Sequence, residues 1–108
     1  MRIYRVRYEW DEEKNRRNQR KHGVSFELGA LALDDPLCLV APDRIDHLTG
    51  EQRWIGLGSA QPATGSRLVL VVSHVYRKDS YGQEIIRIFS ARPAQKRDLR
   101  RYQAQALE

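Results

Sequence analysis

The sequence contains a single cysteine, Cys38, among its 108 residues. One cysteine excludes an internal disulfide and a zinc site built from several cysteines, and its leucine neighbours are typical of a buried small side chain. No hydrophobic run approaches the ~20 residues that a membrane-spanning helix needs. The arginines at the start of the chain are followed by no apolar segment, which excludes a signal peptide. These absences predict a soluble, cytoplasmic protein without membrane contacts.

Several chemical motifs are also missing. The chain has no Gly-rich nucleotide loop, no HExxH pair and no CxxC pair. Its three histidines, His22, His47 and His74, stand far apart and lack the spacing of metal ligands. We therefore expect neither a metal site nor a cofactor. His74 lies in an apolar segment, which is typical of a hydrogen-bonded histidine in a core.

Positive charge, by contrast, is abundant and unevenly distributed. The formal net charge is +5, and the sequence pI is about 9.7. Residues 1–22 carry eight lysines and arginines against four acidic residues, residues 92–108 carry five against two, and residues 23–83 carry five against seven. This balance favours a polyanionic partner, either nucleic acid or an acidic protein that competes for the same surface. A fold that brings the two basic ends together would create one positive face.

The pattern of apolar residues and helix caps predicts a single α+β domain over residues 1–108. Tyr4 to Trp10 alternate as in a half-exposed strand. Asp11 can cap a helix that ends at Gly23, and Ser25 can cap a second, apolar helix. The first of these helices is expected to be polar and the second to be buried.

Four further strands and a last helix complete the prediction. The strands are expected at residues 37–41, 53–59, 68–76 and 85–89, with a polar loop at 42–50. Pro93 fixes φ where the last helix would begin. The resulting order, β-α-α-β-β-β-β-α, is typical of an antiparallel meander with two N-terminal helices and one C-terminal helix packed on one face. Gly56 and Gly58 lie on the same side of their strand and favour close approach by a helix or a ligand.

The first predicted helix has no apolar residue between Asp11 and Lys21. Lys14, Asn18 and His22 are each four residues apart, so they would form one stripe along a helix face. Two interpretations stay open for this stripe. It belongs either to a solvated helix held by its long side-chain stems, or to one wall of a binding site.

Arginine offers the main chemical possibility. Four arginines lie in predicted strands or at their ends: Arg53, Arg77, Arg87 and Arg92. Arg87 interrupts a buried run and is expected to point inward. Guanidinium groups at fixed positions bind phosphate oxygens, and they would stabilise the charge that builds up when a 2′-hydroxyl attacks the RNA backbone.

Attack by a 2′-hydroxyl also needs a group that takes the 2′ proton and a group that returns a proton to the 5′ oxygen. The sequence offers Glu51, His22, Lys14, Lys96 and Tyr102, and their spacing does not choose among them. The alternative is that the arginines only bind backbone phosphate or form ion pairs with Asp and Glu.

Four stretches of the chain match the sequence pattern of one known family. They are WDEEKNRRNQRKHGVSFE at residues 10–27, DDP at 34–36, EQRWIGLG at 51–58 and IRIFSARPAQKRDLRRY at 86–102. These stretches resemble the BrnT toxins, the ribonuclease halves of bacterial type II toxin–antitoxin pairs. The resemblance implies a RelE-like fold, RNA cleavage that arrests translation, and a small ribbon–helix–helix antitoxin, BrnA, as the partner. Operator DNA would be contacted only through that antitoxin.

The resemblance and the charge pattern together predict roles for individual residues. The predicted catalytic residues are Arg53, Arg77, Arg87, Arg92, Lys14 and His22. The predicted RNA contacts are Trp10, Asn18, Lys21, Lys96, Arg97 and Tyr102. The predicted antitoxin contacts are Lys14, Arg92, Lys96 and Arg100. Metal-independent RNA cleavage is the leading hypothesis, and the alternative is a non-catalytic nucleic-acid-binding or co-repressor subunit that acts only in complex with its antitoxin.

Overall fold

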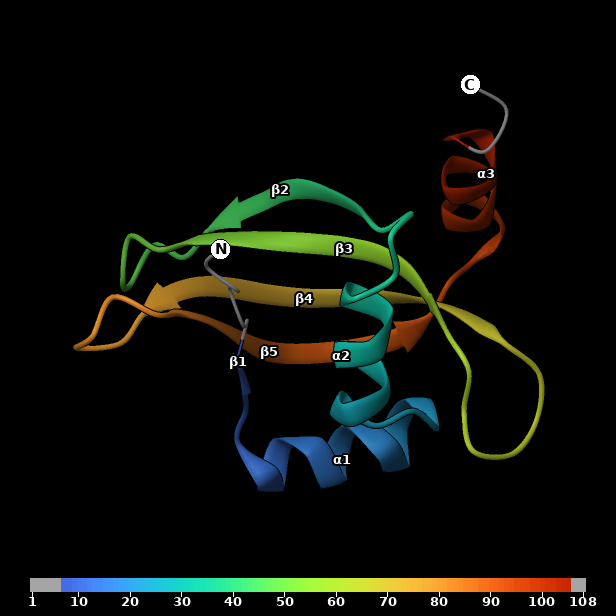
Figure 1. Cartoon of the computed structure of the whole chain (residues 1–108), viewed down its shortest axis with the longest axis horizontal. Helices are drawn as coiled ribbons and strands as arrows, with labels where there is room; N and C mark the ends of the chain where they lie inside the picture. Colours follow the sequence, from blue (N-terminus) through green and yellow to red (C-terminus); the bar gives the residue numbers. More distant parts are fainter. Residues whose placement is uncertain (1–6, 106–108) are drawn as a thin grey trace, which may run out of the picture.

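The computed structural model describes residues 7–105, which form one β-sheet and three helices (Figure 1). The elements in chain order are β1 (Arg7–Glu9), α1 (Glu12–His22), α2 (Phe26–Leu33), β2 (Leu39–Ile45), β3 (Gln52–Ala60), β4 (Leu68–Lys78), β5 (Glu84–Pro93) and α3 (Lys96–Ala104). The strands lie in the order β1-β5-β4-β3-β2. Strands β2 to β5 form the predicted antiparallel meander, whereas β1 pairs with β5 in parallel. The α+β class and the order of elements are confirmed, and the sheet is mixed.

Helix α1 begins and ends where its caps predict. The Asp11 carboxylate accepts hydrogen bonds from the backbone N–H groups of Glu13 and Lys14. Gly23 follows the helix with a φ of 74°, the left-handed conformation that glycine adopts at little cost. Acidic residues in the first turn and basic residues in the last turn complement the helix dipole.

Two buried asparagines attach α1, which has no apolar residue of its own, to the rest of the fold. The side-chain oxygen of Asn15 accepts the backbone N–H of Phe26. Asn18 donates to the carbonyl oxygens of Val24 and Ala91, and it accepts the N–H of Ala91. Strand β1 is short and ends before it reaches Ala91 of β5. The Asn18 side chain therefore makes the backbone hydrogen bonds at Ala91 that a neighbouring strand would otherwise make. The helix is therefore held by buried amides and not only by long side-chain stems.

Helix α2 packs closely on β3 because two glycines leave room for it. The buried residues of α2 are Phe26, Gly29 and Ala32. A Cβ atom at Gly58 would lie 1.8 Å from the carbonyl oxygen of Ala32, and a Cβ at Gly56 would lie 2.4 Å from Leu33 Cδ2. Both separations are far shorter than van der Waals contact. The predicted close approach is confirmed, and the neighbour is a helix.

The core lies between the sheet and the first two helices. Its buried hydrophobic residues are Val24, Phe26, Ala32, Ala60, Leu70, Val72, Ile86, Ile88 and Ala91. The Trp10 ring packs edge-on against Phe26, with the ring centroids 6.2 Å apart. His74 is fully buried, as predicted, and its ring donates to the carbonyl of Val72 and accepts from the hydroxyl of Tyr76. Burial lowers the pKa of His74, so the ring is neutral.

Two element boundaries differ from the sequence prediction. Strand β2 continues through Pro42 to Ile45, in a stretch predicted to be a loop. Because β2 is the last strand of the sheet, Pro42 removes no hydrogen bond from an inner ladder. Strand β5 runs to Pro93, and α3 starts at Lys96 after its N-cap Gln95. Pro93 therefore ends a strand and does not begin the helix.

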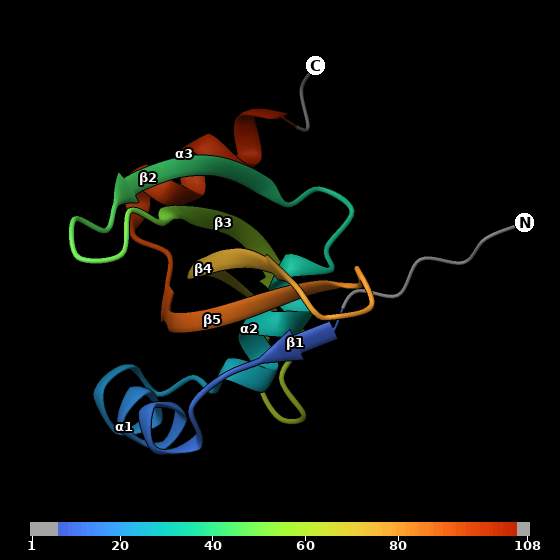
Figure 2. The ribbon, with the colours of Figure 1, turned by 90° about the vertical axis from the view of Figure 1, so that its left-hand side faces the viewer.

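Helix α3 lies apart from α1 and α2, so the three helices do not share one face of the sheet. It follows the end of β5 and contacts β3 (Figure 1). Figure 2 shows α1 and α3 at opposite ends of the stack of strands, with α1 beyond β5 and α3 near β2 and β3. In the described residues, the two basic helices α1 and α3 therefore stand apart.

Three smaller expectations concern the burial of Cys38, the first strand and membrane-spanning helices. Cys38 is half-buried, and burial raises the pKa of its thiol to about 11. Tyr4–Val6 of the predicted first strand lie outside the described residues. In the described part of the chain, no helix has the length and apolar character to cross a membrane.

Candidate nucleic-acid interface

One face of the sheet packs against α1 and α2, and the other carries the strand arginines. Gly56 points towards α2, and successive residues of a strand point to opposite faces, so Arg53 points away from the helices. The residues that pair across β3, β4 and β5 point to the same face, so Arg77, Arg87 and Arg92 share the face of Arg53. We call this second face the arginine face and define it by Arg53, Arg77, Arg87 and Arg92; α3 lies at its Arg92 end. Arg87, which was expected to point inward, lies half-exposed on this face.

Arg53 and Arg87 lie at the same level of the sheet, on either side of β4. On β4, Val75 pairs with Arg87 of β5. The neighbouring pair Trp54–His74 joins β3 to β4, so Arg53 of β3 lies next to Val75 on the side of β4 away from Arg87. Two strand spacings separate the two arginine backbones by roughly 10 Å. Val75 between them is short and fully buried, so both guanidinium groups can reach one bound phosphate.

A bulge in β5 brings Phe89 into the same region. The register between β4 and β5 shifts at this residue, which leaves Phe89 without a partner on β4. Arg53 Cζ lies 4.4 Å from the Phe89 ring centroid, and Lys14 Nζ lies 5.7 Å from it. Cations over an aromatic face are attracted to it, so the ring joins Lys14 of α1 to the arginine face. The sequence indicated only a strand residue here, because a bulge leaves no mark at the position itself.

The α1 stripe lines an open hollow of about 250 Å³ beside Phe89. The lining residues are Lys14, Arg17, Asn18, Lys21, His22, Phe89 and Ser90. All the basic side chains that line the hollow come from α1. The hollow therefore favours the interpretation of the stripe as one wall of a binding site. Arg17, Phe89 and Ser90 were not among the predicted site residues.

Every residue of the arginine face is paired with a carboxylate. The nitrogen–oxygen distances are 3.1 Å for Arg53–Asp46, 3.3 Å for Arg77–Glu51, 3.3 Å for Arg87–Glu9 and 3.1 Å for Arg92–Asp98. Ion pairing was one of the two interpretations of these arginines, and the structure shows it. The four arginine side chains are nevertheless 23% to 46% exposed. Pairs of this kind contribute at most about 1 kcal/mol, so a phosphate can replace the carboxylate.

Two of these carboxylates also hold their own loops in place. Asp46 accepts the N–H of Leu48 and the N–H that follows it, and these bonds lower the pKa of Asp46. Burial works to raise the pKa of Asp98, but hydrogen bonds from the Gln95 N–H and from Arg92 hold it below its usual value. Asp46 and Asp98 are thus structural anchors as well as arginine partners.

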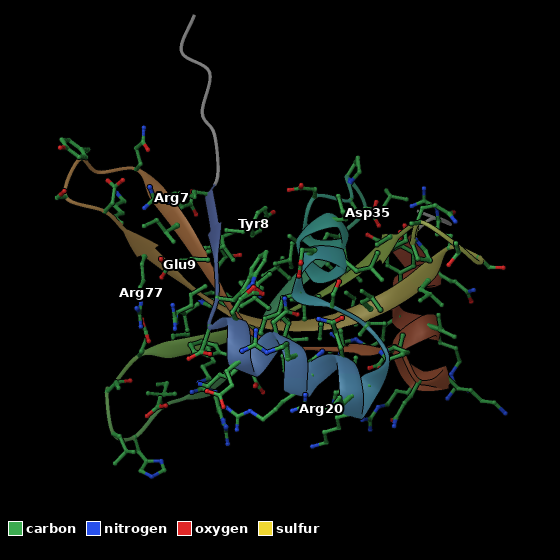
Figure 3. All side chains as sticks on the ribbon, turned by 90° about the horizontal axis from the view of Figure 1, so that it is seen from below. Arg7, Tyr8, Glu9, Arg20, Asp35 and Arg77 are labelled. Carbon is green, nitrogen blue, oxygen red and sulfur yellow. The ribbon has the colours of Figure 1, made fainter. Side chains whose placement is uncertain are left out.

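The four arginines do not converge on one point. Arg92 of β5 pairs with Val71 of β4, and Arg77 lies six residues further along β4. This corresponds to a separation of about 20 Å. Arg53 and Arg87 lie between these ends. Figure 3 shows Arg77 at the end of the sheet where β1 enters. The four arginines therefore form a row along this face, with Arg53 and Arg87 in its middle.

Three of the predicted RNA contacts have structural partners. Asn18 is bonded to backbone groups, and Trp10 packs on the core. The Tyr102 hydroxyl donates a hydrogen bond to Asp35, at the other end of the sheet from Arg77 (Figure 3). Their contacts with RNA stay predictions.

The remaining predicted residues lie on two separate helices. Lys21 and His22 line the hollow on α1, together with Lys14. Lys96, Arg97 and Arg100 are exposed on α3. Arg92 connects to α3 through its ion pair with Asp98. The predicted antitoxin contacts therefore come from α1, from the end of β5 and from α3.

The fold and the site together define a class of protein. A small α+β fold that presents rows of arginines beside a basic helix is suited to binding a nucleic-acid backbone. A family model described as "Ribonuclease toxin, BrnT, of type II toxin-antitoxin system" matches residues 10–98. The chain belongs to this family of ribonuclease toxins, and the resemblance seen in the sequence is confirmed. A type II toxin has a cognate antitoxin, and a ribonuclease has an RNA substrate. Comparison with curated proteins gives no match.

Proposed function

We propose that this chain is a metal-independent endoribonuclease, which cuts RNA by attack of a 2′-hydroxyl on the adjacent phosphate and so inhibits translation. The observation that carries the proposal is the position of Arg53 and Arg87 on either side of Val75. Lys14 joins them through its contact with Phe89. Three cations thus surround one small area of the arginine face.

This arrangement suits the charge that develops during the reaction. When the 2′ oxygen attacks, negative charge grows on the non-bridging oxygens of the phosphorus. Arg53 and Arg87, held at the same level of a rigid sheet, stabilise that charge without having to rearrange. The expected products are one fragment that ends in a 2′,3′-cyclic phosphate and one that begins with a 5′-hydroxyl.

The outer cations bind the RNA strand on both sides of the cut. Arg77 and Arg92 lie towards the two ends of the arginine face, where they meet flanking phosphates. The hollow beside Phe89 holds a further part of the strand, with Lys21 and His22 at its wall. Lys96 and Arg97 extend the contact along α3. These residues set affinity, and the central pair sets the rate.

The proposed partner is a ribbon–helix–helix antitoxin related to BrnA, which acts in the cytoplasm and binds operator DNA on behalf of the pair. An acidic segment of that partner would lie across Lys14, Arg92, Lys96 and Arg100 and exclude RNA by covering the same surface. Because α1 and α3 stand apart, such a segment would have to cross the arginine face between them.

The test is expression of the chain alone in growing bacteria, with protein synthesis followed by labelled amino-acid incorporation. Growth and synthesis should stop with the wild-type chain and continue with the double variant Arg53→Ala, Arg87→Ala. Arg20→Ala is the matched control, because Figure 3 shows Arg20 on α1 outside the arginine face, and it should remain toxic. Normal growth with the folded wild-type protein present would contradict the proposal.

One observation favours a second candidate, a subunit that binds nucleic acid without cutting it. Each arginine of the arginine face already has a carboxylate partner. If Arg53 stays paired with Asp46 when RNA binds, the phosphate loses one of its two central arginines, and the face supplies affinity without catalysis. The purified chain would then bind RNA and leave it intact, and it would increase the affinity of the antitoxin for operator DNA.

A further inference from the structure

Strand β1 contributes one acidic residue to the arginine face. Glu9 pairs with Arg87 in the parallel register of β1 and β5, so both side chains point to the same side of the sheet. Glu9 Oε1 lies 3.3 Å from Arg87 Nη1. The Glu9 side chain is 35% exposed, so a bound RNA strand can reach it.

Glu9 differs from the other three carboxylates that pair with the arginine face. Asp46 and Asp98 also accept backbone N–H groups, which keep them in place. Glu51 uses both of its oxygens on Arg77, at 3.3 and 3.4 Å. Among residues 7–105, Glu9 accepts a hydrogen bond from Arg87 alone, through Oε1. Its second oxygen is thus available to a ligand.

The position of Glu9 is fixed from both sides. The backbone of β1 is paired with β5, and Trp10 next to it packs on the core. A phosphate bound by Arg53 and Arg87 would therefore lie close to Glu9, because Arg87 contacts both groups. A base must lie close to the 2′-hydroxyl, and that hydroxyl lies close to the phosphate under attack.

We propose that Glu9 is the general base of the ribonuclease reaction, and that Arg87 both orients it and binds the reacting phosphate. This inference rests on the proposed function. The Glu9 carboxylate takes the proton of the 2′-hydroxyl, and the 2′ oxygen forms a bond to phosphorus. The bond from phosphorus to the 5′ oxygen breaks, and its electron pair goes to that oxygen, which takes a proton from the Lys14 ammonium group. Glu9 then loses its proton to water and Lys14 regains one.

The charged groups around Glu9 are known from the elements that flank it. On this face, Arg87 of β5 lies next to Glu9, and Arg77 of β4 lies one strand further away. Strand β1 itself carries Arg7, which pairs with Asp79. Helix α1 begins with Glu12 and Glu13 and then brings Lys14. Arg87, Arg77, Arg7 and Lys14 are thus the cations around Glu9, and Asp79, Glu12 and Glu13 are the other carboxylates.

The experiment is single-turnover cleavage of a short RNA by the wild-type chain, Glu9→Gln and Glu9→Asp, measured across pH. Affinity is measured separately with an uncleavable RNA that carries 2′-deoxyribose at the cut. Glu9→Gln should cut about 10²- to 10⁴-fold more slowly and bind the uncleavable RNA as tightly as the wild type. The fall in rate at acid pH should disappear in Glu9→Gln, and Glu9→Asp should keep it.

Two further variants separate this inference from its competitors. Glu84→Gln, at an exposed position on the same strand as Arg87, is the matched control and should behave as the wild type. A wild-type rate in Glu9→Gln, or a slow rate with an unchanged pH profile, would overturn the inference. A loss of the acid limb in Glu51→Gln and not in Glu9→Gln would assign the base to Glu51 instead. If the wild-type chain cuts no RNA at all, the proposed function fails first, and the inference fails with it.

Discussion

The two faces of this sheet are built in opposite ways from alternate residues of the same strands. On the helix side, Phe26 and Ile88 are buried, and Gly58 lies so close to α2 that no side chain fits. On the arginine face, long charged side chains are partly exposed and paired with carboxylates. The helix side thus carries the main core, whereas the arginine face carries partly exposed cations around a smaller set of buried residues, Leu57, Val71, Val75 and Ile85. Substitutions should therefore separate folding from RNA cleavage.

The largest expected effect is on the arginine face. Arg53→Ala and Arg87→Ala should each lower the rate of RNA cleavage by roughly ten- to a thousandfold, the scale of losing one group that stabilises the transition state. The free energy of unfolding should change by no more than about 1 kcal/mol, since the lost ion pairs are partly exposed. Cleavage assays and urea unfolding on the same samples check both numbers. Unfolding of either variant would abolish the distinction between the faces.

On the helix side, Gly58→Ala should destabilise the protein by about 3 kcal/mol or more, because its Cβ would lie 1.8 Å from the carbonyl oxygen of Ala32. Urea unfolding measures the loss. Ser59→Ala is the neighbouring control on the opposite face, and it should cost less than about 1 kcal/mol. Equal stability of Gly58→Ala and the wild type would mean that α2 does not pack on β3 as described.

Asn18→Ala should have an intermediate effect, which lowers both the stability of the fold and the rate of RNA cleavage. It removes buried hydrogen bonds to Val24 and Ala91, which costs about 1–3 kcal/mol. Hydrogen exchange should show faster exchange in α1 than elsewhere, because the helix loses its attachment to β5. Cleavage should slow as well, since α1 carries Lys14. Gln19→Ala, on an exposed position of the same helix, should leave α1 protected.

The smallest effect is expected at the far end of the sheet, where Tyr102→Phe removes a hydrogen bond to Asp35. Burial works to raise the pKa of Asp35, but bonds from Tyr102 and from the N–H groups of Ser59 and Leu37 hold it below its usual value. A carboxylate with a lowered pKa adds stability above its unfolded pKa and loses it as pH falls through the lowered value. Tyr102→Phe should therefore cost about 1 kcal/mol at pH 7, and less below about pH 4. Thermal melts across pH would show a constant difference if Asp35 is not involved.

Much of the fold could be predicted because its signals are local. Asp11, Gly23 and Ser25 mark helix ends by their own chemistry, and the structure has them as caps. The paired glycines, Gly56 and Gly58, indicated the close neighbour that proved to be α2. Such signals depend on the backbone at one position and need no knowledge of distant residues.

The site was harder to predict because it depends on pairing between strands. Arg87 lies in a run where Ile85, Ile86 and Ile88 are all buried, so alternation could not tell which way it points. The bulge at Phe89 and the register of Glu9 become visible only when β5 has its neighbours. Charge counts showed how basic the chain ends are and could not show that α1 and α3 stand apart.

The central claim is that the arginine face cuts RNA through the 2′-hydroxyl. The most direct measurement is cleavage of an RNA oligonucleotide in excess EDTA, beside the same oligonucleotide with 2′-deoxyribose at the cut position, with the product ends identified by mass. The claim predicts a 2′,3′-cyclic phosphate from the first substrate and no cut at the substituted position of the second. Cleavage that stops in EDTA and returns with magnesium, or a cut at the 2′-deoxy position, would contradict it.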